Sequence, residues 1–287
     1  GLGEVYKGQG LDGTPRSSLR PQAPSFGDGT ALPSLFSIAG RDGHLVVAGR
    51  MMRFEGPAHH YTDYVASLSA DGAVRFCYGS HQGGTDNPKE ITVDELGDWS
   101  NCRFWALGRG GEVYLAPDRD RWRIEVRDQD GNLLRTISRP VVPHRRTPEE
   151  KEAAKSIYSF SIDGELPTIS FRMADTDAVI DGLRFNGREL HVYGPTRGTA
   201  APGTKTFDVL DAEGRFLETR TVRLPGCGPG DELFLLDDGR AICVKNLDAA
   251  VAAAEAGRQV QVGDKRREAT ESTGGDDLVV ILCAPAP

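Results

Sequence analysis

Three aspartates in this chain have the side-chain chemistry to hold a cation. Asp175 and Asp177 alternate within one short stretch, and Asp231 lies further along the sequence. Carboxylate oxygens at alternate positions suit a hard cation such as Ca²⁺. The same side chains could instead cap turns or lie in solvent, because no EF-hand spacing accompanies them. In the leading interpretation the protein therefore binds no cofactor, and in the alternative interpretation it binds Ca²⁺.

A second set consists of His59, His60 and Asp63, which contains the paired histidine of the sequence. A histidine near an aspartate can ligate a metal, or act as a general base whose ring the carboxylate orients. We expect this motif in a loop between two strands, where an exposed pair without a catalytic role is the other interpretation. The sequence has no GxSxG elbow and no ordered serine, histidine and aspartate trio. No catalytic residue is therefore assigned.

The five cysteines are too sparse for a disulfide-rich scaffold, and no CxxC motif occurs. Cys243 and Cys283 fall on adjacent predicted strands, so a disulfide between them is one interpretation. Buried free thiols are the other. An odd number of cysteines leaves at least one thiol unpaired.

These residues are positioned by a repeat of short apolar strands joined at glycine turns. Asp-Gly and Asn-Gly turns predict hairpins, because two-residue turns need the positive φ that glycine tolerates. The second turn of each repeat is written Ala70-Asp71-Gly72, Gln129-Asp130-Gly131 and Ala212-Glu213-Gly214, with a degraded copy near 274–275. Four short strands joined in this way form an up-and-down antiparallel sheet, which is one blade of a β-propeller.

The predicted fold class is all-β, a β-propeller of four-stranded antiparallel blades, of which four are legible and five or six are possible. A pair of packed β-sandwiches is the alternative. The repeats are expected at 34–80, 100–138, 170–224 and 228–285, after an N-terminal strand and irregular connector at 1–33. The last repeat lacks a fourth strand, which residues 4–7 are expected to supply by bringing the two termini together.

Two segments interrupt the repeats. Thr147-Pro148-Glu149-Glu150 is a capping box with proline at the first helical position, and it predicts a helical insertion at 147–158, with the helix itself over 148–158. The second is an alanine-rich stretch that runs into glycine and serine, and it predicts a mobile loop at 247–275.

One blade carries a resemblance to a known family. Its sequence reads Phe104-Trp105-Ala106-Leu107, Gly111-Glu112-Val113-Tyr114, Trp122-Arg123-Ile124-Glu125-Val126 and Asp130-Gly131-Asn132-Leu133. It resembles the six-bladed β-propeller proteins of the NHL/TolB-like type, many of which are bacterial, exported and uncharacterised. The resemblance covers about 34–285 and implies a periplasmic or extracellular location. A six-bladed ring would need two more units, within 1–33 and 139–175 or upstream of Gly1, where a signal peptide or longer segment is expected to be missing.

Composition limits the partners. A net charge of −8 and a pI near 5.3 argue against a nucleic-acid partner, and no apolar run is long enough for a transmembrane segment.

The leading hypothesis is a non-enzymatic binding or scaffolding module with a protein partner, as a subunit or accessory protein of an exported or membrane-associated assembly. The alternative is a propeller hydrolase, lactonase or lyase with a divalent ion held by Asp175, Asp177 and Asp231 at the central channel. Any small-molecule ligand is left open.

Overall fold

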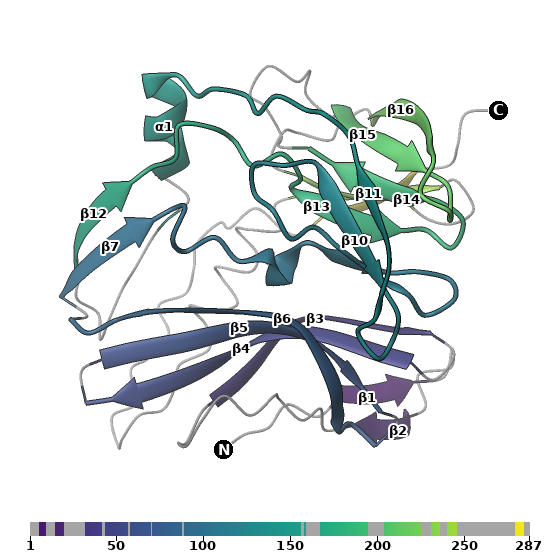
Figure 1. Cartoon of the computed structure of the whole chain (residues 1–287), viewed down its shortest axis with the longest axis horizontal. Helices are drawn as coiled ribbons and strands as arrows, with labels where there is room; N and C mark the ends of the chain where they lie inside the picture. Colours follow the sequence, from purple (N-terminus) through teal and green to yellow (C-terminus); the bar gives the residue numbers. More distant parts are fainter. Residues whose placement is uncertain are drawn as a thin grey trace.

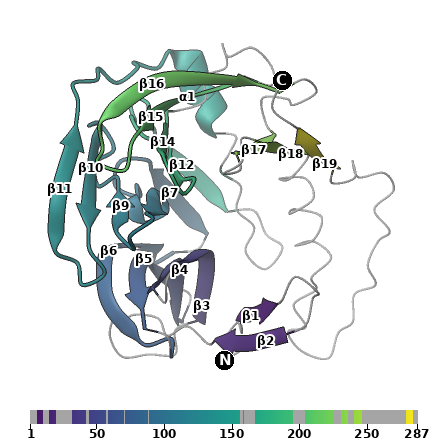
Figure 2. The ribbon, with the colours of Figure 1, turned by 90° about the vertical axis from the view of Figure 1, so that its right-hand side faces the viewer.

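Antiparallel sheets arranged around a common centre form most of the molecule (Figures 1 and 2). The computed structural model describes residues 6–9, 15–19, 32–41, 44–56, 58–69, 71–87, 89–155, 158, 167–194, 204–224, 231–235, 240–245 and 279–283. The predicted loop at 247–275 and the degraded turn near 274–275 lie outside these ranges.

Three sheets have four strands in sequential order, as an up-and-down blade requires. Blade 1 consists of β3 (Leu32–Arg41), β4 (His44–Glu55), β5 (Ala58–Leu68) and β6 (Val74–Thr85). Blade 2 consists of β8 (Trp105–Leu107), β9 (Val113–Leu115), β10 (Arg123–Arg127) and β11 (Leu133–Ser138). Blade 3 consists of β13 (Gly182–Phe185), β14 (Leu190–Tyr193), β15 (Thr204–Leu210) and β16 (Phe216–Arg223).

The remaining antiparallel strands form a fourth sheet and a separate hairpin. In the described residues blade 4 has three strands, β17 (Glu232–Leu235), β18 (Ala241–Lys245) and β19 (Val279–Cys283). The prediction that residues 4–7 add the fourth strand is wrong, because β1 (Tyr6–Gln9) pairs with β2 (Pro15–Leu19). Strand β2 lies within the segment that was expected to be an irregular connector. Local hairpin pairing thus prevails over pairing with the far end of the chain.

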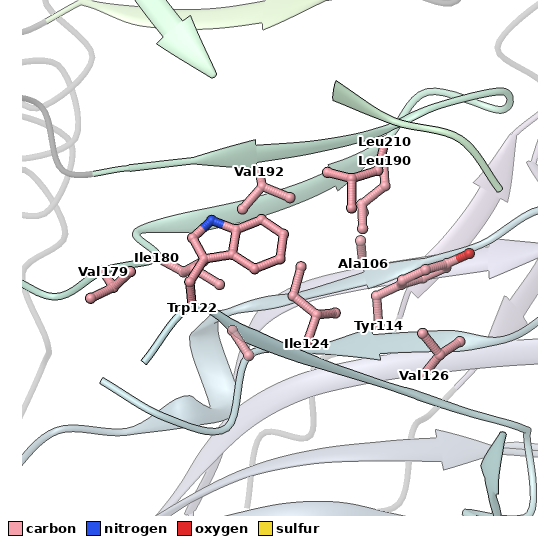
Figure 3. Packing of buried hydrophobic residues seen from close by; sticks show 11 residues of the cluster. Ala106, Tyr114, Trp122, Ile124, Val126, Val179, Ile180, Leu190, Val192 and Leu210 are labelled. Atoms are coloured by element: carbon pink, nitrogen blue, oxygen red, sulfur yellow. The ribbon is translucent and has the colours of Figure 1, made fainter. Parts of the chain in front are cut away.

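Hydrophobic side chains pack between neighbouring blades. One buried cluster joins Val46, Ala48 and Val65 of blade 1 to Trp105 and Leu115 of blade 2. The next joins blade 2 to blade 3, where Trp122 and Ile124 face Val192 and Leu190 (Figure 3). A sheet that cannot bury both faces alone is completed by its neighbours, as in repeat architectures. Trp105, Tyr114 and Trp122 therefore pack between blades.

The turns between the third and fourth strands of blades 1 to 3 share one hydrogen-bond pattern. The amides of Gly72, Gly131 and Gly214 donate to the carbonyls of Ser69, Asp128 and Asp211, three residues back. Each glycine has φ of 87°. The register shifts by one residue beside each of these turns. They are therefore three-residue turns that end in a glycine bulge, not the two-residue turns expected.

A parallel sheet and a helix lie beside the blades. Strands β7 (Glu90–Asp94) and β12 (Thr168–Arg172) form a two-stranded parallel sheet, which the sequence analysis did not predict. Helix α1 (Pro148–Lys155) confirms the predicted helix with an earlier end. In Figure 1 these three elements lie together on the left. They form a platform at one end of the molecule, and we call α1, β7 and β12 the insertion platform.

Candidate functional site

The histidine motif lies on a strand and not in a loop. His59, His60 and Asp63 belong to β5, which pairs with β4 and β6 along its whole length. Successive side chains of a strand point to opposite faces, so His59 and His60 diverge, and His60 lies on the face opposite Asp63. His59 contacts Phe54 edge to face, and His60 lies 3.6 Å from Asp86. The three residues therefore form no common site.

Asp63 instead forms an ion pair that the sequence analysis missed. It faces Arg50 across β4 and β5, and the guanidinium donates to both carboxylate oxygens, at 2.6 and 3.0 Å. The Arg50 guanidinium also lies 3.8 Å from the centre of the Tyr61 ring. The sequence does show oppositely charged residues on adjacent strands. However, only the register of β4 with β5 reveals that Arg50 and Asp63 lie opposite each other.

Asp175 and Asp177 are brought to the insertion platform, where each has its own cationic partner. Asp175 pairs with Lys151 of α1, and Asp177 accepts from Arg146 Nε at 2.6 Å. Hydrogen bonding to Lys151 holds the pKa of Asp175 below its usual range. Asp231 lies in blade 4, with a carboxylate oxygen 3.9 Å from the Cys243 sulfur. Among the described residues no three histidine, cysteine or acidic side chains converge as a metal site. The proposed Ca²⁺ ligands stay a prediction.

A charged network fastens the insertion platform to the blades. Glu95, directly after β7, accepts from Arg146 Nη1 at 2.7 Å and from Arg119 Nη2 at 3.3 Å, and also from the Ala174 amide at 2.9 Å. Arg119 then donates to the Thr176 carbonyl at 2.6 Å. Burial acts to raise the pKa of the Glu95 carboxyl. The opposing effects, of which the hydrogen bond from Arg146 is the largest, hold this pKa below its usual value. The network joins chain segments that are far apart in the sequence.

Helix α1 is exposed although it is firmly attached. The predicted capping box is confirmed, because the Glu150 amide donates to Thr147 Oγ1 at 3.2 Å and the Thr147 amide donates to Glu150 Oε2 at 2.8 Å. No residue of α1 is buried. Lys155 lies over the Phe171 ring at 5.8 Å, which ties the helix to β12. The helix therefore offers its outer face to solvent from a fixed position.

The cysteines fall into two groups. Cys77 and Cys102 are free thiols, as one interpretation expected. Cys243 belongs to a disulfide. The register of β18 and β19 pairs Cys243 with Ile281 and Ala241 with Cys283, so Cys243 and Cys283 are diagonal neighbours. Their pairing stays a prediction, and Cys227 lies outside the described residues.

Comparisons with known proteins identify no family. No family model and no curated protein matches the sequence. A solved structure of a protein of unknown function from Bacteroides caccae is 13% identical, with a TM-score of 0.36, over 84% of this chain and 64% of that one. The β-propeller domain of the Trilobed protease from Pyrococcus furiosus, described as having an open velcro topology, is 9% identical, with a TM-score of 0.31. That match covers 74% of this chain and 48% of the other.

The class of protein therefore follows from the sheets themselves. Sequential four-stranded antiparallel sheets, stacked through apolar faces around a common centre, define an all-β, propeller-like protein. In the described residues no helix has the length and apolar character needed to cross a membrane.

Proposed function

We propose that this chain is a non-enzymatic binding or scaffolding module. It would serve as a subunit or accessory protein of an exported or membrane-associated assembly, within the NHL/TolB-like group of bacterial propellers. The observation that carries the proposal is the insertion platform, which combines an exposed helix with a buried anchoring network. A surface held rigidly in place loses little conformational entropy when a partner binds.

The charged groups favour binding over catalysis. Three of the four carboxylates considered for chemistry have a cationic partner: Asp63 has Arg50, Asp175 has Lys151, and Asp177 has Arg146. A carboxylate used as a base or ligand would first have to leave its partner. The disulfide at Cys243 supports an oxidising compartment, periplasmic or extracellular, because disulfides persist there.

The test is co-purification from the native cell envelope with a charge reversal on α1. Glu152→Arg changes a carboxylate of α1 that is 73% exposed and pairs with Lys155. The matched control is Glu213→Arg, in the β15–β16 turn, where the carboxylate is 67% exposed and pairs with Arg215. We expect a protein that co-purifies with the wild type and with Glu213→Arg to be lost, at least ten-fold, with Glu152→Arg. A chain that is a lone monomer at every stage would contradict the proposal.

The alternative, a hydrolase, lactonase or lyase that uses Ca²⁺, makes a separate prediction. Binding of Ca²⁺ to Asp175, Asp177 and Asp231 would raise the melting temperature, because a ligand that binds only the folded state stabilises it. The scaffold proposal expects no shift up to millimolar Ca²⁺. If a shift occurs, Asp177→Asn should abolish it, whereas Glu213→Gln should leave it unchanged. A shift that Asp177→Asn removes would favour the alternative.

A further inference from the structure

Two free thiols at the junction of blades 1 and 2 lie against one backbone oxygen. Cys77 belongs to β6 of blade 1, and its sulfur donates to the Gly79 carbonyl at 3.3 Å. Cys102 belongs to the 3₁₀ helix η1 (Asn101–Arg103), which leads into the first strand of blade 2, and its sulfur lies 3.6 Å from the same oxygen. Both sulfurs share this acceptor, so they are close neighbours.

Local structure holds the two thiols in this arrangement. The register of β5 with β6 shifts between Val65 and Ala66, so that Ala66 pairs with Cys77 and Val65 with Gly79. Tyr78, the extra residue, donates through its hydroxyl to the Asp128 carbonyl of blade 2 at 3.0 Å. The amide of Cys102 donates to Ser100 Oγ at 3.3 Å, which caps η1. A bulge on one side and a capped turn on the other thus aim the cysteines at the junction of the blades.

We propose that Cys77 and Cys102 form a reversible disulfide that fastens blade 1 to blade 2 under oxidising conditions. The oxidant is a small-molecule disulfide such as glutathione disulfide. Cys77 is partly exposed and Cys102 is fully buried, so the order of attack is set by access.

The exchange proceeds in two balanced steps. The Cys77 thiolate attacks one sulfur of glutathione disulfide, forms a mixed disulfide and releases one glutathione thiolate. Cys102 loses its proton to solvent, attacks the Cys77 sulfur and displaces the second glutathione thiolate. The protein gives up two electrons and two protons, and one glutathione disulfide becomes two glutathione molecules.

Burial makes this reaction slow at neutral pH. It raises the pKa of Cys77, and it raises the pKa of Cys102 to about 11. Only thiolates attack disulfides. The rate of disulfide formation should therefore rise about ten-fold per pH unit, as long as the pH is below the pKa of both thiols. The pair therefore closes only slowly at neutral pH, even in an oxidising compartment.

The experiment is disulfide mapping of the folded full-length chain after equilibration in glutathione buffers. Acid quenching, alkylation in denaturant and trypsin digestion place Cys77 in the peptide 76–89 and Cys102 in the peptide 90–103. We expect the oxidised buffer to yield these two peptides linked, with both alkylatable thiols lost together and regained on reduction. The chain should remain a monomer on a non-reducing gel.

Single variants test the order of attack. Cys102→Ala should leave Cys77 as a stable glutathione adduct, and Cys77→Ala should leave Cys102 reduced for as long as the chain is folded. Three outcomes would overturn the proposal: a wild-type chain in which Cys77 carries glutathione while Cys102 stays free, a link that forms only in urea, or a link between two chains. Circular dichroism of each variant confirms that it has folded.

Discussion

Arg50 and Asp63 form a cross-strand ion pair, whereas the sequence suggested a catalytic role for Asp63. The Asp63 side chain is 2% exposed and that of Arg50 is 26% exposed. A carboxylate buried to this degree needs a permanent partner, because removing one member of a buried pair leaves an uncompensated charge. The pair is therefore structural, and its loss should be measurable as stability.

Replacing Arg50 with Met should lower the free energy of unfolding by about 3–5 kcal/mol, because Asp63 would be left charged and buried. Arg50→Lys should cost less, since it keeps the charge but loses the bidentate geometry. Urea denaturation at pH 7 provides the measurement. The matched control is Arg215→Met, where the arginine is 75% exposed beside Asp211 and the expected loss is much smaller, because solvent screens an exposed pair. Equal losses at the two sites would disprove the structural role of the buried pair.

At the scale of elements, two of the three glycine turns, those at Gly131 and Gly214, also receive a side chain from the preceding blade. A Cβ at Gly131 would overlap the Phe76 ring on β6, and one at Gly214 would overlap Ile137 on β11. Arg75 and Arg135, on the same two strands, donate to Gln129 Oε1 at 3.1 Å and to the Ala212 carbonyl at 2.6 Å in the next turn. The glycine thus permits both the left-handed backbone and the contact between blades.

Gly131→Ala should therefore destabilise the fold by more than the cost of placing an alanine in the left-handed backbone conformation. The backbone cost is about 1–2 kcal/mol, and forcing a methyl group against Phe76 adds about 1–3 kcal/mol. Gly56→Ala is the control, because Gly56 has φ of 60° and nothing within 4 Å of the added methyl. Chemical denaturation of both variants should give the larger loss for Gly131→Ala. A double-mutant cycle with Phe76→Ala should recover part of that loss, and additive effects would argue against the contact.

At the scale of the whole molecule, the network around Glu95 links stability to pH. The folded-state pKa of Glu95 lies below its usual value, despite the opposing effect of burial, because Arg146 and Arg119 favour the charged form. A depressed folded-state pKa adds stability above the unfolded-state pKa, about 4.3. This contribution is lost as pH falls from that value through the folded-state pKa. The insertion platform should thus loosen in acid.

Glu95→Gln tests this linkage. We expect the variant to be less stable than the wild type at pH 7 by about 3 kcal/mol, since Arg119 and Arg146 lose a charged partner. We also expect it to lose less stability than the wild type between pH 5 and pH 3. Thermal melts across this range provide the measurement. Parallel curves for the two proteins would show that Glu95 does not carry the acid dependence.

Sequence reasoning was most successful where the deciding contacts are local. The capping box of Thr147 and Glu150 lies within one helical turn and was predicted correctly. The histidine motif was misplaced because β4 and β5 extend to Glu55 and Ala58, beyond the apolar positions that marked the strands. The sequence analysis identified Asp63, Asp175 and Asp177 as candidate site residues, but it did not predict the cationic partner of any of them.

The amino-acid sequence by itself determined the strands of the four-stranded blades, their order and the positions of the glycine turns, because alternation and turn chemistry act over a few residues. Only the tertiary structure decided which remote segments meet. It paired β7 with β12 and Arg146 with Glu95, and it paired β1 with β2 in place of the last blade. Such pairings depend on the path of the whole chain and on which charges must be buried together. Local sequence patterns do not encode that information.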